Sequence, residues 1–292
     1  MFQGSLVALI TPFKNGIVDE DRLRELVEFH LQNGTSGLVP CGTTGESPTL
    51  SHDEHKKVVR IVVEQARRRI PVIAGTGSNS TVEALDLTMD AKKYGADASL
   101  LLCPYYNRPT QKGLYLHFKE ISSKVNIPII IYNIPSRTGV NLMPETLAKL
   151  TSECSGIVGI KEATGSMDQT SRIVELCGEK FCVLSGDDSL TLPIMSIGGK
   201  GVISVAANIV PRDTSDMTAK FLRGDLKGAR ELHQKLFPLI KALFLETNPI
   251  PVKTAMSLMG MDTGELRLPL ATMEEEDLGK LKRALKEYGL IK

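Results

Sequence analysis

The sequence has no run of apolar residues long enough to span a lipid bilayer. Its apolar run near the start, Leu6 to Ile10, lacks the basic segment and the long apolar segment of a signal peptide. There is also no cluster of basic residues, and the formal net charge is +1. The composition therefore gives no reason to expect nucleic acid or an anionic membrane as a partner.

Cysteine is scarce, and its spacing does not suggest pairing. The five cysteines are odd in number, and no two of them form a Cys-x-x-Cys motif. Most lie in apolar segments, so we expect reduced structural thiols in place of disulfides or a structural zinc site. Together with the lack of an apolar span, this predicts a cytoplasmic protein.

Motifs for several common catalytic groups are also missing. The sequence contains no His, Cys or carboxylate set with catalytic-zinc spacing, no Gly-x-Ser-x-Gly elbow and no Cys/His nucleophile signature. His52 and His55 lie one helical turn apart and offer two metal ligands, but no third ligand is evident nearby. We therefore expect no metal site.

What the sequence does contain is a regular alternation of short apolar runs and helical patterns. The runs are 5–10, 37–40, 70–74, 98–103, 127–132, 157–161, 181–185 and 201–205. They recur at roughly the spacing of a strand–helix unit, which is about 30 residues. Eight such units predict a (β/α)8 barrel. The rival fold is a doubly wound open sheet, but no glycine fingerprint joins the first strand to its helix.

Helix start signals support this reading. Ser51 with Glu54, and Ser80 with Glu83, have the spacing of capping boxes at the start of apolar-periodic stretches. Pro144 lies where the first turn of a helix is expected.

From about Gly224 onward the pattern is helical only, around 229–244, 251–259 and 274–288. We therefore expect residues 1–223 to form the catalytic barrel. Residues 224–292 are expected to form a C-terminal helical extension that packs on the barrel.

Lys161 ends one of the predicted strands, in the sequence Gly156-Ile-Val-Gly-Ile-Lys161-Glu162. A charge at the end of a buried strand must be paired, desolvated or exposed to solvent. A lysine that merely emerges into water is one interpretation. The other is a desolvated lysine whose lowered pKa makes it an amine nucleophile.

Other polar groups follow the predicted strands at the same edge. In a (β/α)8 barrel the catalytic groups come from the carboxyl ends of several strands and from the loops after them. These ends carry 42–46 (Gly-Thr-Thr-Gly-Glu), 104–109 (Pro-Tyr-Tyr-Asn-Arg-Pro), 132–139 (Tyr-Asn-Ile-Pro-Ser-Arg-Thr-Gly), Lys161 and 186–188 (Gly-Asp-Asp). An amine, tyrosines, threonines and an arginine are therefore expected to face one cavity.

Each of these groups also has an ordinary interpretation. The turn at 42–46 offers N–H groups and hydroxyls to a small carboxylate, or it is a simple glycine turn. Arg137 binds a second carboxylate, or it forms a surface ion pair. Tyr132 is a reactive hydroxyl or a core ring. Their shared location favours the functional interpretation of the whole set.

Taken together, these motifs resemble the dihydrodipicolinate synthase family of pyruvate-dependent class I aldolases. The resemblance runs from Leu6 to the C-terminus. It rests on 42–46, 132–139, 159–162 (Gly-Ile-Lys-Glu) and 248–253 (Asn-Pro-Ile-Pro-Val-Lys). The first and third motifs mark the superfamily, whereas Arg137 and the last motif point to the synthase branch.

The resemblance implies a catalytic role for four residues. Lys161 forms a Schiff base with pyruvate, and the resulting enamine attacks L-aspartate 4-semialdehyde, in the diaminopimelate route to lysine. Tyr132, Thr44 and Tyr106 relay protons, and Tyr106 reaches the active site of a neighbouring subunit. The implied chemistry needs no metal or organic cofactor.

The resemblance also implies substrate contacts. Thr43 and Thr44 hold the carboxylate of pyruvate, and Arg137 holds that of the semialdehyde. Gly186 and Ile203 line the pocket through their backbone carbonyls.

A second site and an assembly are implied as well. A pocket for an L-lysine effector corresponds to Ser47, Pro48, His52, His55, Asn79, Glu83 and Tyr105. Pro48 replaces a smaller residue common in the family. The alternative is that these residues only cap helices and line an interface. The implied assembly is a homotetramer, a dimer of dimers.

Two other functions remain open on sequence alone. One is another pyruvate aldolase, such as an N-acetylneuraminate or keto-deoxy-sugar-acid lyase. The Arg137-Thr-Gly sequence disfavours it, because sugar-acid pockets need groups that read hydroxyls. The other is a barrel that binds ligands without catalysis, which the full set of reactive residues disfavours.

Overall fold

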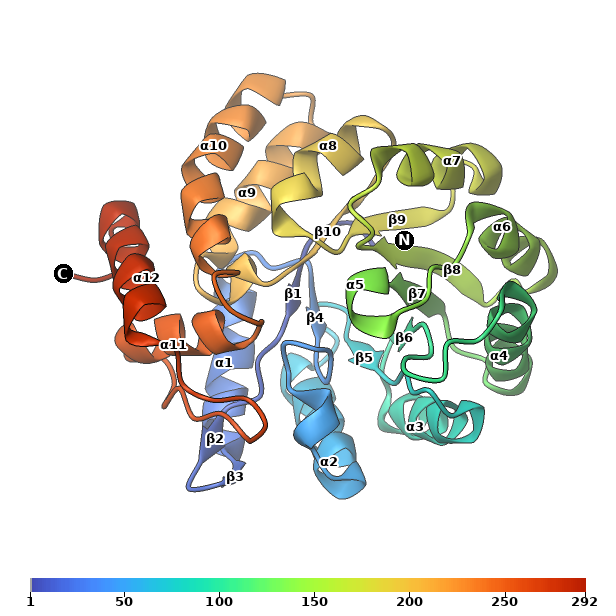
Figure 1. The fold of residues 1–292 in the computed structure, drawn as a ribbon, viewed down its shortest axis with the longest axis horizontal. Coiled ribbons are helices and arrows are strands. Elements are labelled where there is room, and N and C mark those ends of the chain that lie inside the picture. Colours follow the sequence, from blue (N-terminus) through green and yellow to red (C-terminus); the bar gives the residue numbers. More distant parts are fainter. Residues whose placement is uncertain (1) are drawn as a thin grey trace.

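The protein is described from a computed structural model that covers residues 2–292. Eight parallel strands form a barrel with helices around it (Figure 1). The strands are β1 (Gly4–Ala8), β4 (Gly37–Val39), β5 (Ile73–Gly75), β6 (Ala98–Leu102), β7 (Ile129–Asn133), β8 (Ile157–Glu162), β9 (Cys182–Ser185) and β10 (Gly201–Ser204). The predicted (β/α)8 barrel is confirmed, because each of the eight apolar runs overlaps one of these strands.

The barrel closes at a seam between β4 and β5. The hydrogen-bonded order runs β4-β1-β10-β9-β8-β7-β6-β5, and an isolated parallel bridge between Leu38 and Val72 joins its two ends. Pro40 and Pro71 lie in this seam, where their carbonyls accept from Gly75 N and Leu38 N, both at 2.9 Å. Because proline has no N–H to donate, the ladder cannot lengthen there. This explains why β5 begins at Ile73, later than the predicted start of the run.

The outer helices are α1 (Glu20–Gln32), α2 (His52–Ala66), α3 (Thr81–Tyr94), α4 (Gln111–Lys124), α6 (Pro144–Glu153), α7 (Met167–Cys177), α8 (Thr191–Ser196) and α9 (Pro211–Leu222). Short helical turns lie in the loops: η1 (Ser47–Thr49), α5 (Pro135–Thr138), η2 (Asp188–Leu190) and η3 (Ala206–Asn208). Among residues 2–292, no helix combines the length and the apolar character needed to cross a membrane.

One of the two predicted capping boxes is confirmed and the other is wrong in part. Ser51 and Glu54 bond reciprocally at the start of α2. At the start of α3, Ser80 Oγ accepts from Glu83 N at 3.5 Å. The Glu83 carboxylate does not return to the cap, however, because Ser78 and His52 bind it instead. Pro144 is the first residue of α6, as predicted.

A small hairpin precedes α1 and was not predicted. It consists of β2 (Phe13–Lys14) and β3 (Ile17–Val18), joined by Asn15 and Gly16, which both have positive φ. An Asn-Gly pair with this geometry is the usual two-residue turn of a hairpin. The Asn-Gly dipeptide therefore predicts this hairpin turn from sequence alone.

The C-terminal segment forms α10 (Leu226–Ala242), α11 (Ile250–Leu258) and α12 (Glu275–Tyr288). Leu239, Val252 and Leu281 of these helices share one apolar core with Val27 of α1. The hairpin also holds this segment, since Thr263 Oγ1 donates to Phe13 O at 2.6 Å. Figure 1 shows α11 and α12 on the same side of the barrel as α1 and the hairpin. We propose that residues 224–292 form an extension that packs on the barrel.

Candidate active site

The Lys161 side chain lies inside the barrel, not in solvent. It is 6% exposed, and its Nζ lies 4.1 Å from the centre of the Tyr132 ring. Tyr132 and Lys161 are register partners on β7 and β8. Burial lowers the pKa of Lys161 to about 8, while Asp188 raises it and Arg137 lowers it further. About a tenth of the amine is therefore neutral, and nucleophilic, at pH 7, and the neutral fraction rises steeply above that pH.

Tyr132 is a buried hydroxyl beside this amine. Burial raises its pKa to about 12, against the opposing effects of Arg137 and of a hydrogen bond with the Thr43 side chain. Tyr132 is therefore protonated at neutral pH and able to donate a proton. Its ring face also favours a cation at the position of Nζ.

The turn after β4 is held tightly from several sides. Thr44 is buried, and its Oγ1 accepts from Asn248 Nδ2 at 2.9 Å. Thr11 Oγ1 donates to Gly45 O at 2.7 Å. Gly75 of β5 packs so closely that an added Cβ would collide with the Cys41 carbonyl. Gly45 is also closely packed, since a Cβ added there would be 3.0 Å from the Leu9 carbonyl oxygen, and this packing helps to fix where Thr44 lies.

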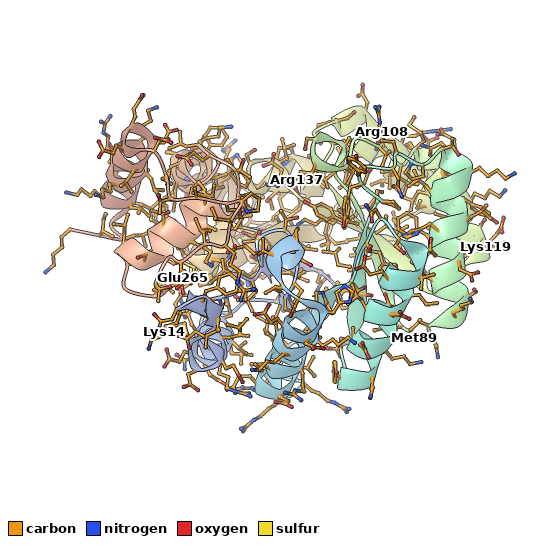
Figure 2. All side chains as sticks on the ribbon, turned by 60° about the horizontal axis from the view of Figure 1, so that its bottom comes forward. Lys14, Met89, Arg108, Lys119, Arg137 and Glu265 are labelled. Atoms are coloured by element: carbon orange, nitrogen blue, oxygen red, sulfur yellow. The ribbon has the colours of Figure 1, made fainter. Side chains whose placement is uncertain are left out.

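Arg137 lies at the rim, on the short helix α5. It is exposed, and its Nη2 donates to Asn248 O at 3.1 Å. Arg108 packs beside Gly139, two residues after Arg137, since its Cδ would be 3.8 Å from a Cβ added there. Both arginines lie toward the upper side of the view in Figure 2. A guanidinium with an exposed face at this rim can bind a carboxylate in two hydrogen bonds.

A cavity of about 380 Å³ joins part of the predicted active site to most of the predicted effector site. Its lining includes Thr43, Tyr132 and Arg137, and it also includes Ser47, Pro48, His52, His55, Glu83 and Tyr105. Lys161 itself does not line the cavity but lies against the ring of Tyr132, which does.

The remaining predicted residues lie in different places. Gly186 is beside the amine, because a Cβ added there would be 3.3 Å from Lys161 Cε. Ile203 is buried on β10. Asn79 does not line the cavity, although its carbonyl accepts from Asn107 Nδ2 at 2.9 Å. Tyr106 is 90% exposed with φ of +69°, so this chain does not bring it to its own Lys161.

The far end of the cavity carries a fixed negative charge. The hydrogen bond from Ser78 and that with His52 lower the pKa of Glu83 against the effect of burial. His52 Nε2 lies 2.7 Å from Glu83 Oε1. Burial lowers the pKa of His55, whose Nε2 donates to Gly75 O at 2.7 Å. A carboxylate in this position suits an ammonium ligand.

Two contributors to the site were not recognised from sequence. Asn248 lies in a motif that was noted, yet its link between Thr44 and Arg137 was not foreseen. Asp188 is buried, and it accepts hydrogen bonds from Ser204 Oγ and from Val205 N. Its carboxylate acts on the pKa of Lys161. Asp188 belongs to the segment 186–188 that was expected at this edge, three residues after the end of β9, but no role was assigned to it.

Comparison with known proteins agrees with this geometry. Residues 1–288 match the model of the Dihydrodipicolinate synthetase family. A 4-hydroxy-tetrahydrodipicolinate synthase from Geobacter sp. (strain M21) is 58% identical over 291 residues, with 100% of both chains covered.

Solved structures agree as well. The crystal structure of dihydrodipicolinate synthase from Aquifex aeolicus has a TM-score of 0.98 and 57% identity, with 99% of each chain covered. The enzyme from Cyanidioschyzon merolae with lysine bound has a TM-score of 0.96 and 39% identity, again with 99% of each chain covered. These relatives are synthases, which favours that branch over the sugar-acid lyases. The chain therefore belongs to the Dihydrodipicolinate synthetase family, and it is an enzyme of the lyase type.

Proposed function

We propose that this chain condenses pyruvate with L-aspartate 4-semialdehyde through an imine on Lys161, the reaction of a 4-hydroxy-tetrahydrodipicolinate synthase. The observation that carries the proposal is the buried amine itself. Lys161 Nζ lies 4.1 Å from the Tyr132 ring centre, and burial lowers its pKa to about 8. A neutral amine is the form that attacks a ketone.

The proposed sequence of steps is balanced in atoms and protons. The amine adds to C2 of pyruvate, and the resulting carbinolamine loses water to give a cationic imine. Loss of a methyl proton gives an enamine, whose carbon attacks the aldehyde of the second substrate. The amino group of that substrate then displaces Lys161 as the ring closes. The imine acts as the electron sink, so we propose that no metal or organic cofactor takes part.

Tyr132 is the proposed proton donor, because it remains protonated at neutral pH and lies against the amine. Thr44 and Tyr106 would connect it to solvent. We assign Tyr106 to the site of a neighbouring subunit, since it is 90% exposed in the single chain. An exposed aromatic ring with a functional role is well suited to an interface. The proposed assembly is a homotetramer.

Substrate contacts follow from the same geometry. Thr43 and Thr44 would bind the carboxylate of pyruvate, and Arg137 that of the semialdehyde. Gly186, beside Lys161 Cε, and Ile203 would bound the pocket through backbone carbonyls.

We further propose that the far end of the cavity binds L-lysine. Glu83 would pair with an ammonium group, and His52 and Tyr105 would lie around it. The C. merolae structure contains lysine. Because one cavity reaches from Glu83 to Tyr132, a ligand at one end would affect binding at the other.

All five thiols are free, which fits the cytoplasm as the proposed location.

The decisive experiment is trapping with borohydride. The protein is incubated with pyruvate and sodium borohydride, digested and analysed by mass spectrometry. We expect reduced pyruvate on Lys161 and no adduct in Lys161→Met. An unmodified Lys161, or an adduct on another lysine, would refute the assignment.

A further inference from the structure

A fully buried ion pair lies behind the turn that follows β4. Lys253 Nζ is 2.7 Å from Glu46 Oε1, and neither side chain has any exposed surface. The ammonium also donates to Thr11 O at 3.0 Å and to Glu265 O at 2.5 Å. Its three donors are therefore all used, and the Phe13 ring centre lies 4.3 Å away. One side chain of α11 thus contacts three other segments of the chain, at Thr11 and Phe13, at Glu46 and at Glu265.

The turn itself needs such support. Cys41 and Glu46 have φ values of +55° and +54°, in the left-handed region that non-glycine residues rarely adopt. Backbone of this kind persists only where surrounding contacts hold it. The Glu46 side chain receives one contact from Lys253 and another from Arg267 N at 3.2 Å. Both partners belong to the C-terminal extension.

The pair is also connected to the threonines in front of it. Glu46 N donates to Thr43 O at 3.1 Å, so the position of Glu46 constrains the backbone of Thr43. On the other side, Asn248 Nδ2 holds Thr44 Oγ1. The segment 248–253 therefore contacts the turn at Thr44 and at Glu46, two residues apart.

We propose that Glu46 and Lys253 are positioning residues that hold the turn 42–46 in the geometry in which Thr43 and Thr44 bind the carboxylate of pyruvate. Neither residue touches substrate. The inference rests on the proposed function, in which these threonines bind pyruvate. It gives the C-terminal extension a specific task, which is to set how well the first substrate is bound.

A buried ion pair could instead serve stability alone, and the two roles give different kinetics. Removing one partner leaves an unpaired buried charge, which destabilises strongly, whereas removing both avoids this. We therefore choose the double variant Glu46→Gln/Lys253→Met. In a ping-pong reaction the kcat/KM for each substrate reports its own half of the cycle.

The experiment measures kcat/KM for pyruvate and for the semialdehyde in the same preparation. If the pair positions the turn, kcat/KM for pyruvate falls by up to about a hundred-fold, because small misplacements of binding groups are costly. The value for the semialdehyde stays close to that of the wild type. If the pair only stabilises the fold, the active fraction falls and both values drop by the same factor. Equal losses, or no loss, would overturn the inference.

Two further proteins make the result specific. Glu46→Gln alone keeps the side-chain volume. We expect it to lower kcat/KM for pyruvate while kcat/KM for the semialdehyde stays close to that of the wild type. Leu147→Ala removes a fully buried side chain of α6 in a different core cluster. It should lower the thermal midpoint and change kcat/KM for the two substrates by the same factor. Wild-type trapping separates the two proposals. A wild type without a pyruvate adduct refutes the proposed function, whereas a normal adduct with equal losses in the variants refutes only the positioning role.

Discussion

The amine of Lys161 lies over the face of the Tyr132 ring, 4.1 Å from its centre, at the end of two neighbouring strands. The ring face attracts a cation, whereas burial lowers the pKa of Lys161 to about 8. The same ring face would stabilise the cationic imine once pyruvate has added. In the proposed mechanism this contact would therefore stabilise the charged intermediate more than the neutral nucleophile.

This pKa predicts the pH dependence of pyruvate use. The neutral fraction of Lys161 grows as the pH rises through about 8, so kcat/KM for pyruvate should rise and then level off. Tyr132, with a pKa of about 12, stays protonated over this range. The measurement is a pH profile of kcat/KM from pH 6 to 10. A rise centred near 10.5, the ordinary lysine value, would contradict the prediction.

The buried amine should also lower stability at neutral pH. Lysine in the unfolded chain binds its proton up to about pH 10.5, whereas folded Lys161 releases it near 8, so stability rises with pH between these values. Lys161→Met removes this penalty and should stabilise the protein at pH 7 by about 3 kcal/mol. Thermal midpoints of both proteins at pH 7 and pH 10 test this. If the difference in thermal midpoint between the two proteins is as large at pH 10 as at pH 7, titration of Lys161 is not the cause.

The Tyr132→Phe variant removes the hydroxyl and keeps the ring, so it tests the two roles of Tyr132 separately. The ring face beside Lys161 remains, so the pH at which pyruvate use rises should stay near 8. The proton donor is lost, and turnover should fall by about a hundred-fold or more. Steady-state rates and the pH profile of the variant measure both effects. Near-normal turnover would exclude Tyr132 from proton transfer.

Arg137→Ala should affect the second substrate most. Loss of a charge-assisted contact to its carboxylate is expected to raise KM for the semialdehyde by about ten- to a hundred-fold. Imine formation with pyruvate should persist, but at higher pH, because Arg137 lowers the pKa of Lys161. Arg108→Ala removes a nearby guanidinium to which we assign no role, and serves as the matched control. Loss of the imine in Arg137→Ala would contradict the assignment.

The proposed lysine site depends on the charge of Glu83. L-lysine should raise the thermal midpoint of the wild type, and Glu83→Gln should weaken that binding about ten-fold or more. Lys56→Met is the control, since Lys56 pairs with Asp90 at 2.9 Å and does not line the cavity. Equal shifts for wild type and Glu83→Gln would show that this end of the cavity does not bind lysine.

Much of the barrel could be predicted because its signals are local. β-branched runs, helix caps and the position of Lys161 at a strand end are all read from neighbouring residues. The convergence of strand ends at one edge of the barrel then predicts that Lys161, Thr44 and Tyr132 lie close together.

The parts that were missed depend on contacts between distant residues. Asn248 and Thr44 are 204 positions apart, and Lys253 and Glu46 are 207 apart, so no spacing rule links them. The second capping box failed for a related reason. Glu83 has the right spacing from Ser80, but His52 of another helix competes for its carboxylate. Local patterns do not record such competition.

The seam between β4 and β5 has a consequence for how the barrel moves. Pro40 and Pro71 have no N–H to donate, so β4 and β5 are joined by fewer backbone hydrogen bonds than a regular pair of neighbouring strands. The lining of the cavity includes residues from both sides of this seam, Gly42 after β4 and Gly75 of β5. We therefore expect opening motions of the barrel to be largest at this seam, and a ligand that contacts both sides of the cavity to restrain them.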